Sequence, residues 1–337
     1  MGEVQKITIV PVARLAQKFP DGEGLSPGDL PCAIASNVFL ADIGQQMKSL
    51  DLELWRREYL SRHGVERIQG WKYALVHYYR GEEYLHGTPE SQSLELLRKI
   101  FVALRIVRPS NVPFQYIHAR IKHDGSFDPS GFSRAEMPLT VSARDKWATI
   151  RPKDIELLRA LVPRLLAAYE TKTRPVTRAA NILETGYNSP SFDVKLLLWV
   201  AGWEALFASS AYNGAPAVTG RLRHFLGSRT RIYDAADFPT FLMLPDLTLK
   251  DVLEDIYRVR NSLAHGEWVP GDIMRRPGHS GLASSYADIL LDASGLALRL
   301  ALARILRQSL LETFSDKGKL DTYFSYDPIT KRRPCES

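Results

Sequence analysis

The sequence predicts a mainly α protein that begins with an α+β domain and continues as an all-α helical bundle. Two observations predict this fold class. Runs rich in β-branched and aromatic residues, which favour strands, occur in the first 150 residues. Beyond them, leucine and alanine recur at the spacing of amphipathic helices. A chain of 337 residues suggests about two domains, which we place at 1–150 and 151–315, followed by a polar tail at 316–337.

The elements of the first domain follow from composition and spacing. Strand-like composition marks the runs 4–12, 31–40, 71–79 and 114–121. Leucine and isoleucine at helical spacing predict a helix over 91–107, which ends before Pro109. Residues 124–150 contain several glycines and prolines and are expected to be loops, so the domain boundary is placed there.

The second domain is expected to be helical throughout. The predicted helices span 154–169, 177–183, 192–207, 219–226, 249–265 and 284–313. Ser191 is a candidate N-cap of the third, Gly266 ends the fifth, and Gly295 is where the last would kink. Long helices joined by short loops predict an antiparallel bundle. The tail from Asp316 is polar and is expected to fray.

Composition excludes several classes of protein. With 45% hydrophobic residues and a net charge of +6, the chain is not intrinsically disordered. Two cysteines, Cys32 and Cys335, are too few for a disulfide scaffold. The longest apolar region, 289–311, is broken by charged residues, which disfavours a transmembrane helix. The first residues lack the apolar segment of a signal peptide, so we expect a cytoplasmic protein with no membrane partner.

The familiar motifs for phosphate, dinucleotide and zinc binding are absent from the sequence. It contains no G-x-x-x-x-G-K-[ST], no G-x-G-x-x-G, no H-E-x-x-H and no C-x-x-C. His118 and His123 are five residues apart on an expected strand and turn, and we do not expect them to converge on a metal. We therefore expect neither a cofactor nor a metal.

The excess of positive charge is spread over both halves of the chain but is sharper locally in residues 220–232, which contain no acidic residue. Such a segment is compatible with a polyanionic partner such as RNA, because phosphates bind basic side chains. A solvated basic loop is an equally good interpretation. The basic residues of this segment are Arg221, Arg223, His224, Arg229 and Arg231.

The most informative stretch is 251–268, where a helix of about 100° per residue separates two stripes. The apolar stripe consists of Val252, Ile256, Val259 and Leu263. The polar stripe on the opposite face consists of Glu254, Arg258, Asn261 and His265. Arg260 lies between the two stripes. A histidine in the last helical turn can serve as a general acid or base near neutral pH. An ordinary polar face that simply ends the helix is the alternative interpretation.

From Ile256 to Gly266 the chain reads Ile-Tyr-Arg-Val-Arg-Asn-Ser-Leu-Ala-His-Gly. This string resembles the R-x4-H motif of HEPN domains and is similar to the Apea-like branch of that superfamily. Upstream, 196–207 ends in Glu204-Ala-Leu-Phe, which is similar to the first bundle helix of the family. The resemblance covers residues 175–312. Glu204 borders an apolar stripe and needs a polar partner, so we expect it to face Arg260, with another partner or water as the alternative.

The resemblance implies a HEPN-type helical bundle that forms a homodimer and cleaves RNA without a metal. Arg260 would bind the scissile phosphate and His265 would transfer protons, while Asn261 would orient the imidazole or contact phosphate. Arg258, on the same face as His265, would be a supporting phosphate contact. The implied products end in a 2′,3′-cyclic phosphate and a 5′-hydroxyl. Arg221 and Arg223 would hold the RNA backbone.

The sequence leaves two other interpretations open. The bundle is a non-catalytic HEPN-type RNA- or protein-binding module if His265 only ends its helix. The first domain is a small-molecule enzyme if a deep pocket in it is lined by converging acidic residues or by His63, His77 and His86. That domain also resembles, in its position, the sensors fused to HEPN effectors in bacterial defence proteins. An activating ligand or protein would then act on it.

Overall fold

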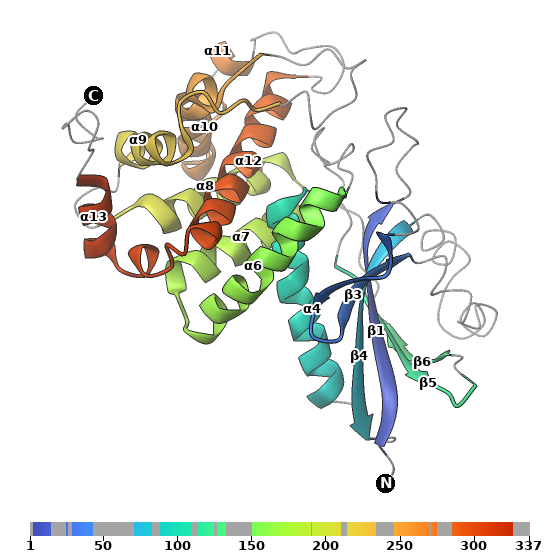
Figure 1. Ribbon diagram of the computed structural model, residues 1–337. Helices are drawn as coiled ribbons and strands as arrows, with labels where there is room; N and C mark the ends of the chain where they lie inside the picture. Colours follow the sequence, from blue (N-terminus) through green and yellow to red (C-terminus); the bar gives the residue numbers. More distant parts are fainter. Residues whose placement is uncertain are drawn as a thin grey trace. The chain divides into compact units, whose positions relative to one another are not determined.

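A computed structural model describes most of the chain, which divides into two compact units (Figure 1). The described residues are 3–14, 25, 29–42, 71–82, 88–109, 114–124, 127–132, 150–189, 191–209, 214–233, 246–269, 271–274 and 285–325. Unit 1 comprises Met1–Leu104, Ser110–Met137 and Thr149–Pro163. Unit 2 comprises Arg105–Pro109, Pro138–Ala148 and Arg164–Ser337. The protein is mainly helical and includes an α+β region, in agreement with the predicted fold class at this level.

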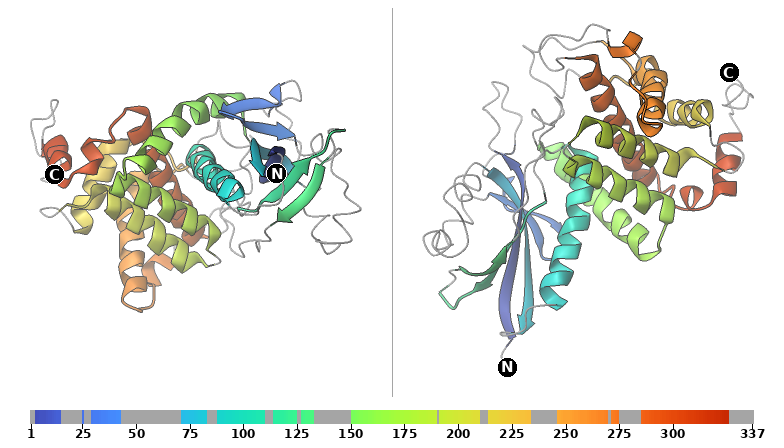
Figure 2. Two further views of the ribbon diagram at one scale, coloured as in Figure 1. Left: turned by 90° about the horizontal axis from the view of Figure 1, so that it is seen from below. Right: turned by 180° about the vertical axis from the view of Figure 1, so that it is seen from behind.

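Unit 1 is built on a six-stranded antiparallel sheet with the strand order β2-β3-β4-β1-β5-β6. The strands are β1 (Glu3–Arg14), β2 (Cys32–Ala35), β3 (Val38–Asp42), β4 (Trp71–Glu82), β5 (Ile117–Ile121) and β6 (Phe127–Phe132). Helix α4 (Thr88–Val107), most of which belongs to unit 1, runs along the sheet (Figure 2). Its Glu90 forms an ion pair of 2.5 Å with Lys6 of β1.

Two predictions for unit 1 are corrected. The run 31–40 is a hairpin rather than one strand, because Ser36 and Asn37 form a turn between β2 and β3. Asn37 has φ of 57°, a left-handed conformation that asparagine tolerates and that lets the chain turn. Strand β6 lies in a segment expected to be a loop, where it pairs with β5. The strands predicted at 4–12 and 71–79 and the helix predicted at 91–107 are confirmed.

Unit 2 is helical in its described residues. Its helices are the end of α6 (Pro152–Glu170), then α7 (Arg174–Asn188), α8 (Phe192–Phe207), α9 (Ala215–Leu226), α10 (Leu249–Ala264), α11 (Gly271–Met274), α12 (Tyr286–Arg307), the 3-10 turn η3 (Thr313–Ser315) and α13 (Lys317–Ser325). Helix α8 packs against α7, α9, α10 and α12. The predicted N-cap is confirmed, because Ser191 Oγ accepts a hydrogen bond of 3.3 Å from the Val194 N–H.

Glycine allows α7 and α12 to approach Trp199 of α8. A Cβ atom at Gly186 would lie 2.3 Å from Trp199 Nε1, and one at Gly295 would lie 2.9 Å from its ring. The Trp199 side chain is 1% exposed. Gly295 therefore makes room for the indole, and α12 is a single helix across it.

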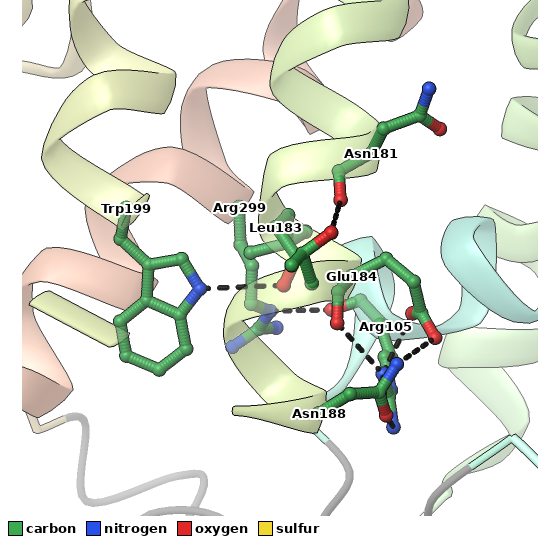
Figure 3. Close-up of polar contacts among 8 residues, drawn as sticks. Arg105, Asn181, Leu183, Glu184, Asn188, Trp199 and Arg299 are labelled. Atoms are coloured by element: carbon green, nitrogen blue, oxygen red, sulfur yellow. Dashed lines mark hydrogen bonds and ion pairs between the residues drawn. The ribbon is translucent and has the colours of Figure 1, made fainter. Parts of the chain in front are cut away.

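Two buried arginines of unit 2 bind polar groups around the end of α4 (Figure 3). Arg105 Nη1 lies 2.7 Å from Glu184 Oε2 of α7 and donates to Asn188 Oδ1 at 3.3 Å. Arg299 Nε donates to the Arg105 carbonyl at 2.8 Å, and its Nη2 donates to the Val107 carbonyl at 2.7 Å. These bonds satisfy terminal carbonyls of α4 and place a cation at the negative end of the helix dipole.

Residues 317–325 form a helix where a fraying tail was expected. Leu320 and Phe324 of α13 are buried, and Phe324 contacts Phe207 and Phe225 at ring-centroid distances of 6.1 and 6.4 Å. These apolar contacts order a segment whose composition is largely polar. Residues 326–337 of the expected tail lie outside the described residues. Among the helices described, none has the length and hydrophobicity needed to span a bilayer.

Candidate functional site

Helix α10 has the two faces that the sequence predicts. Val252, Ile256 and Val259 are buried and pack into the bundle, whereas Leu263, the fourth residue of the predicted apolar stripe, is partly exposed. The predicted polar stripe, consisting of Glu254, Arg258, Asn261 and His265, is exposed. Arg260 lies between the faces with 28% of its side chain exposed. The helix thus presents charged and polar groups on one side while its other side holds it in the core.

Arg260 and Glu204 meet between α10 and α8, as expected. Arg260 Nη2 lies 2.9 Å from Glu204 Oε1 and 3.0 Å from Oε2. The Tyr257 hydroxyl donates to Glu204 Oε1 at 3.0 Å, and the Arg260 guanidinium lies 5.9 Å from the Tyr257 ring centroid. The Glu204 carboxylate and the Tyr257 ring therefore fix the direction of the guanidinium.

Tyr257 was not singled out by the sequence analysis, yet it completes this cluster. Burial raises the pKa of Tyr257, and the negative charge of Glu204 raises the pKa further. The phenol therefore stays protonated and continues to donate its hydrogen bond at any physiological pH. The sequence feature that could have identified Tyr257 is its place as the second residue of the string from Ile256 to Gly266.

His265 ends α10 and is exposed. It is the C-cap residue, and its backbone N–H donates to the Asn261 carbonyl at 3.1 Å. Gly266 follows with φ of +70°, a conformation that favours glycine. The Gly266 N–H donates to the Leu263 carbonyl at 3.2 Å and the Glu267 N–H to the Ser262 carbonyl at 2.8 Å. These two bonds form a Schellman motif, which fixes the backbone on both sides of the histidine.

Asn261 contacts Arg260. Its Oδ1 accepts a hydrogen bond of 3.1 Å from Arg260 Nη1. Within the described residues this is the side-chain contact that Asn261 makes, so it orients the guanidinium here and does not hold the His265 imidazole.

Arg258 shares the exposed face with His265, as predicted, but its charge is already paired. Its Nη1 and Nη2 donate to the two Asp272 oxygens at 3.0 and 3.3 Å, and Nη1 lies 3.7 Å from Asp255. The same interaction lowers the pKa of Asp272. Arg258 thus tethers α11 to α10.

The prediction that Arg221 binds RNA is wrong. Its side chain is 1% exposed, Nη1 donates to the Phe207 carbonyl at 3.0 Å, and Nη2 pairs with Asp321 of α13 at 2.6 Å. The Phe324 ring lies 5.2 Å from the guanidinium carbon. Arg221 therefore links α9 to α8 and α13. Arg223, on the same helix, is partly exposed, and Arg229 and Arg231 are exposed.

The structure describes one of the three histidines that the small-molecule enzyme hypothesis names, which is His77. His77 Nδ1 lies 2.8 Å from Ser93 Oγ, in a partly buried position on β4. His63 and His86 lie outside the described residues. His118 is buried on β5, and His123 is exposed in the turn that follows.

The site thus consists of a fixed guanidinium, an exposed imidazole and a charged contact between two bundle helices. Comparison of the chain with protein-family models, curated proteins and solved structures finds no match.

Proposed function

We propose that this protein is a HEPN-type, metal-independent endoribonuclease that acts as a homodimer in the cytoplasm. The observation that carries the proposal is the Glu204–Arg260 ion pair, which holds a partly exposed guanidinium on the helix that ends at His265. A guanidinium is the side chain best suited to bind a phosphate through two oxygens, and an exposed imidazole can exchange protons with RNA.

Helix geometry supports a site completed by a second copy. His265 lies five positions after Arg260, which corresponds to about 7.5 Å along a helix and about 140° around it. The two side chains of one chain therefore point in different directions. Around a two-fold axis, Arg260 of one copy and His265 of the other can face the same phosphate.

The proposed reaction is an internal transfer within RNA. A neutral His265 removes the proton of the ribose 2′-hydroxyl, whose oxygen attacks the neighbouring phosphorus. The bond from phosphorus to the 5′-oxygen breaks, and the protonated His265 of the other copy supplies a proton to that oxygen. Arg260 stabilises the charge that develops on the phosphate oxygens. The products are a 2′,3′-cyclic phosphate and a 5′-hydroxyl.

The second candidate function is a non-catalytic HEPN-type module that binds RNA or protein. It is favoured by the pairing of both arginines of α10 with carboxylates, Arg260 with Glu204 and Arg258 with Asp272. A phosphate would have to compete with these carboxylates. In this interpretation His265 only ends the helix.

The first experiment incubates purified protein with labelled transfer RNA and total RNA in EDTA. His265→Ala is compared with wild type and with His123→Ala, an exposed histidine of unit 1. We expect cleavage with cyclic-phosphate ends by wild type and His123→Ala, and a loss of at least about 100-fold in His265→Ala. Equal cleavage by all three proteins would indicate another site or a contaminant. RNA binding without cleavage by any of them would favour the binding module.

A further inference from the structure

The surface around the candidate site carries more negative than positive charge. Between positions 254 and 272, carboxylates outnumber arginines among the exposed or partly exposed charged side chains of the described chain. These side chains are Glu254, Glu267, Asp272, Arg258 and Arg260. Glu204 of α8, which is 27% exposed, adds another carboxylate beside Arg260. Such a surface repels a polyanion, so an RNA phosphate meets an unfavourable field before it reaches Arg260.

Both terminal nitrogens of Arg260 already contact oxygen atoms of the protein. Nη2 lies 2.9 and 3.0 Å from the two oxygens of Glu204, and Nη1 donates to Asn261 Oδ1 at 3.1 Å. A phosphate held by a guanidinium uses the same N–H groups, because it too presents negatively charged oxygen atoms. A phosphate that binds through the terminal nitrogens must therefore take the place of the Glu204 carboxylate.

The Glu204–Arg260 contact can open without leaving a buried charge unpaired. The two side chains are 27% and 28% exposed, so water can solvate each of them when they separate. Glu204 also keeps the hydrogen bond of 3.0 Å from the Tyr257 hydroxyl after Arg260 leaves. By contrast, Arg221 in the pair with Asp321 is 1% exposed, and breaking that pair would leave a buried cation without its partner. The Glu204–Arg260 pair is therefore suited to a reversible contact.

We propose that the Glu204–Arg260 ion pair is an autoinhibitory contact, in which the carboxylate competes with an RNA phosphate for the guanidinium. The inference rests on the proposed function in taking RNA as the ligand, and it adds how the site is restrained before RNA binds. Each phosphate contact of Arg260 is offset by the loss of the ion pair. The expected cost is about fivefold in RNA affinity, which corresponds to about 1 kcal/mol.

The test measures RNA binding in the His265→Ala background, in which the proposed cleavage cannot remove the ligand. Glu204→Gln removes the competing charge but keeps an oxygen that can accept the Tyr257 hydrogen bond. Glu267→Gln is the matched control, because it removes the same charge from an exposed position near the end of α10. Each protein is titrated with a labelled single-stranded RNA at one salt concentration. We expect Glu204→Gln to bind about fivefold more tightly, and Glu267→Gln to stay within about twofold of its parent.

A second comparison shows whether Glu204 acts through Arg260. In a background that contains both Arg260→Ala and His265→Ala, Glu204→Gln should no longer change the RNA affinity, because it has no guanidinium to release. Glu204→Ala, which removes the carboxylate entirely, should tighten binding in the presence of Arg260 and should have no effect in its absence. Urea unfolding of each variant identifies any protein that has lost its fold.

The outcomes separate this inference from the proposed function. If wild type cleaves RNA in EDTA but Glu204→Gln binds RNA no more tightly than its parent, the competition is refuted and the nuclease stands. If Glu204→Gln tightens binding only when Arg260 is present, but no protein that retains His265 cleaves RNA, the autoinhibitory contact stands and the nuclease is refuted.

Three other results would overturn the inference. Weaker binding by Glu204→Gln would make the carboxylate a positioning residue for Arg260. Equal tightening by Glu204→Gln and Glu267→Gln, or tightening without Arg260, would show a general effect of charge. No RNA binding by any variant would show that the released guanidinium does not hold a phosphate.

Discussion

The two arginines of α10 each pair with a carboxylate, but the pairs differ in exposure. The side chains of Arg260 and Glu204 are 28% and 27% exposed, whereas those of Arg258 and Asp272 are 49% and 58% exposed. Water and salt screen the second pair more strongly. In addition, Glu204 accepts a hydrogen bond from Tyr257, which restricts the carboxylate. The inner pair should therefore contribute more to stability.

A pair of double-mutant cycles tests this difference. We expect a coupling free energy of about 1 kcal/mol between Glu204 and Arg260, from Glu204→Ala, Arg260→Ala and the double variant. For Arg258 and Asp272 we expect a smaller coupling free energy, because water and salt screen this pair more strongly. Urea unfolding provides each free energy of unfolding. Equal coupling free energies for the two ion pairs would show that the difference in side-chain exposure does not affect their contribution to stability.

At this scale, local patterns predicted some contacts and could not predict others. Glu204 and Arg260 each border an apolar stripe, and this shared position favoured their meeting, with another partner or water as the alternative. Arg221 also looked like a surface residue, but its partner Asp321 is 100 positions away. That partner lies on α13, in a segment whose polar composition suggested a frayed tail. Pairing across such a distance depends on tertiary packing, which residue spacing does not encode.

At the scale of elements, the end of α10 is the feature on which the candidate site depends most. His265 directly precedes Gly266, whose φ of +70° lets the chain turn out of the helix. Gly271 starts the short helix α11 and does not have a positive φ. A Cβ atom at either glycine would have nothing within 4 Å. The two positions differ in backbone conformation and not in available space.

Replacing each of these two glycines with alanine therefore measures the free-energy cost of the left-handed backbone conformation without a contribution from steric crowding. We expect Gly266→Ala to lower the free energy of unfolding by about 1 kcal/mol, because a left-handed residue with a Cβ atom is strained. Gly271→Ala should be neutral within about 0.5 kcal/mol. Thermal or urea unfolding measures both. A neutral Gly266→Ala would mean that the end of α10 adopts another conformation.

Element boundaries were predictable where a local signal marks them. Ser191 and Gly266 are such signals, and both act as expected at the ends of α8 and α10. The hairpin of β2 and β3 was missed because its turn, Ser36-Asn37, lies within an otherwise strand-like run. Gly295 suggested a kink, yet its role is to accommodate Trp199 from another helix.

At the scale of the whole molecule, the two units contain different kinds of polar cluster. The cluster of unit 2 is open to solvent at Arg260 and His265. In unit 1 a polar row crosses the sheet, in which Thr8 lies opposite His77 of β4 and His118 of β5. Thr8 Oγ1 lies 2.7 Å from His118 Nδ1, and Ser93 of α4 donates to Thr8 at 3.0 Å. Thr8, Ser93 and His118 of this row are buried between the sheet and α4, and His77 is partly buried.

The buried row makes the stability of unit 1 depend on pH. Burial lowers the pKa of His118 to about 4; the charge of Glu90 opposes this shift and that of Lys6 adds to it. The unfolded chain titrates near the ordinary value of 6.5. Between these values the unfolded state binds a proton that the folded state does not. The free energy of unfolding should therefore fall as the pH falls from about 6.5 toward about 4.

Replacing His118 with glutamine should flatten this dependence, because glutamine keeps a hydrogen-bonding group near Thr8 but does not titrate. Urea unfolding at about pH 7 and about pH 5 measures how the free energy of unfolding changes with pH. The proteins compared are wild type, His118→Gln and His123→Gln. We expect His123→Gln to behave as wild type, since that histidine is exposed. Some dependence should persist in His118→Gln, because burial also lowers the pKa of His77. If the free energy of unfolding changes equally with pH in all three proteins, His118 is not buried as a neutral side chain. The buried polar row between α4 and the sheet would then be incorrect.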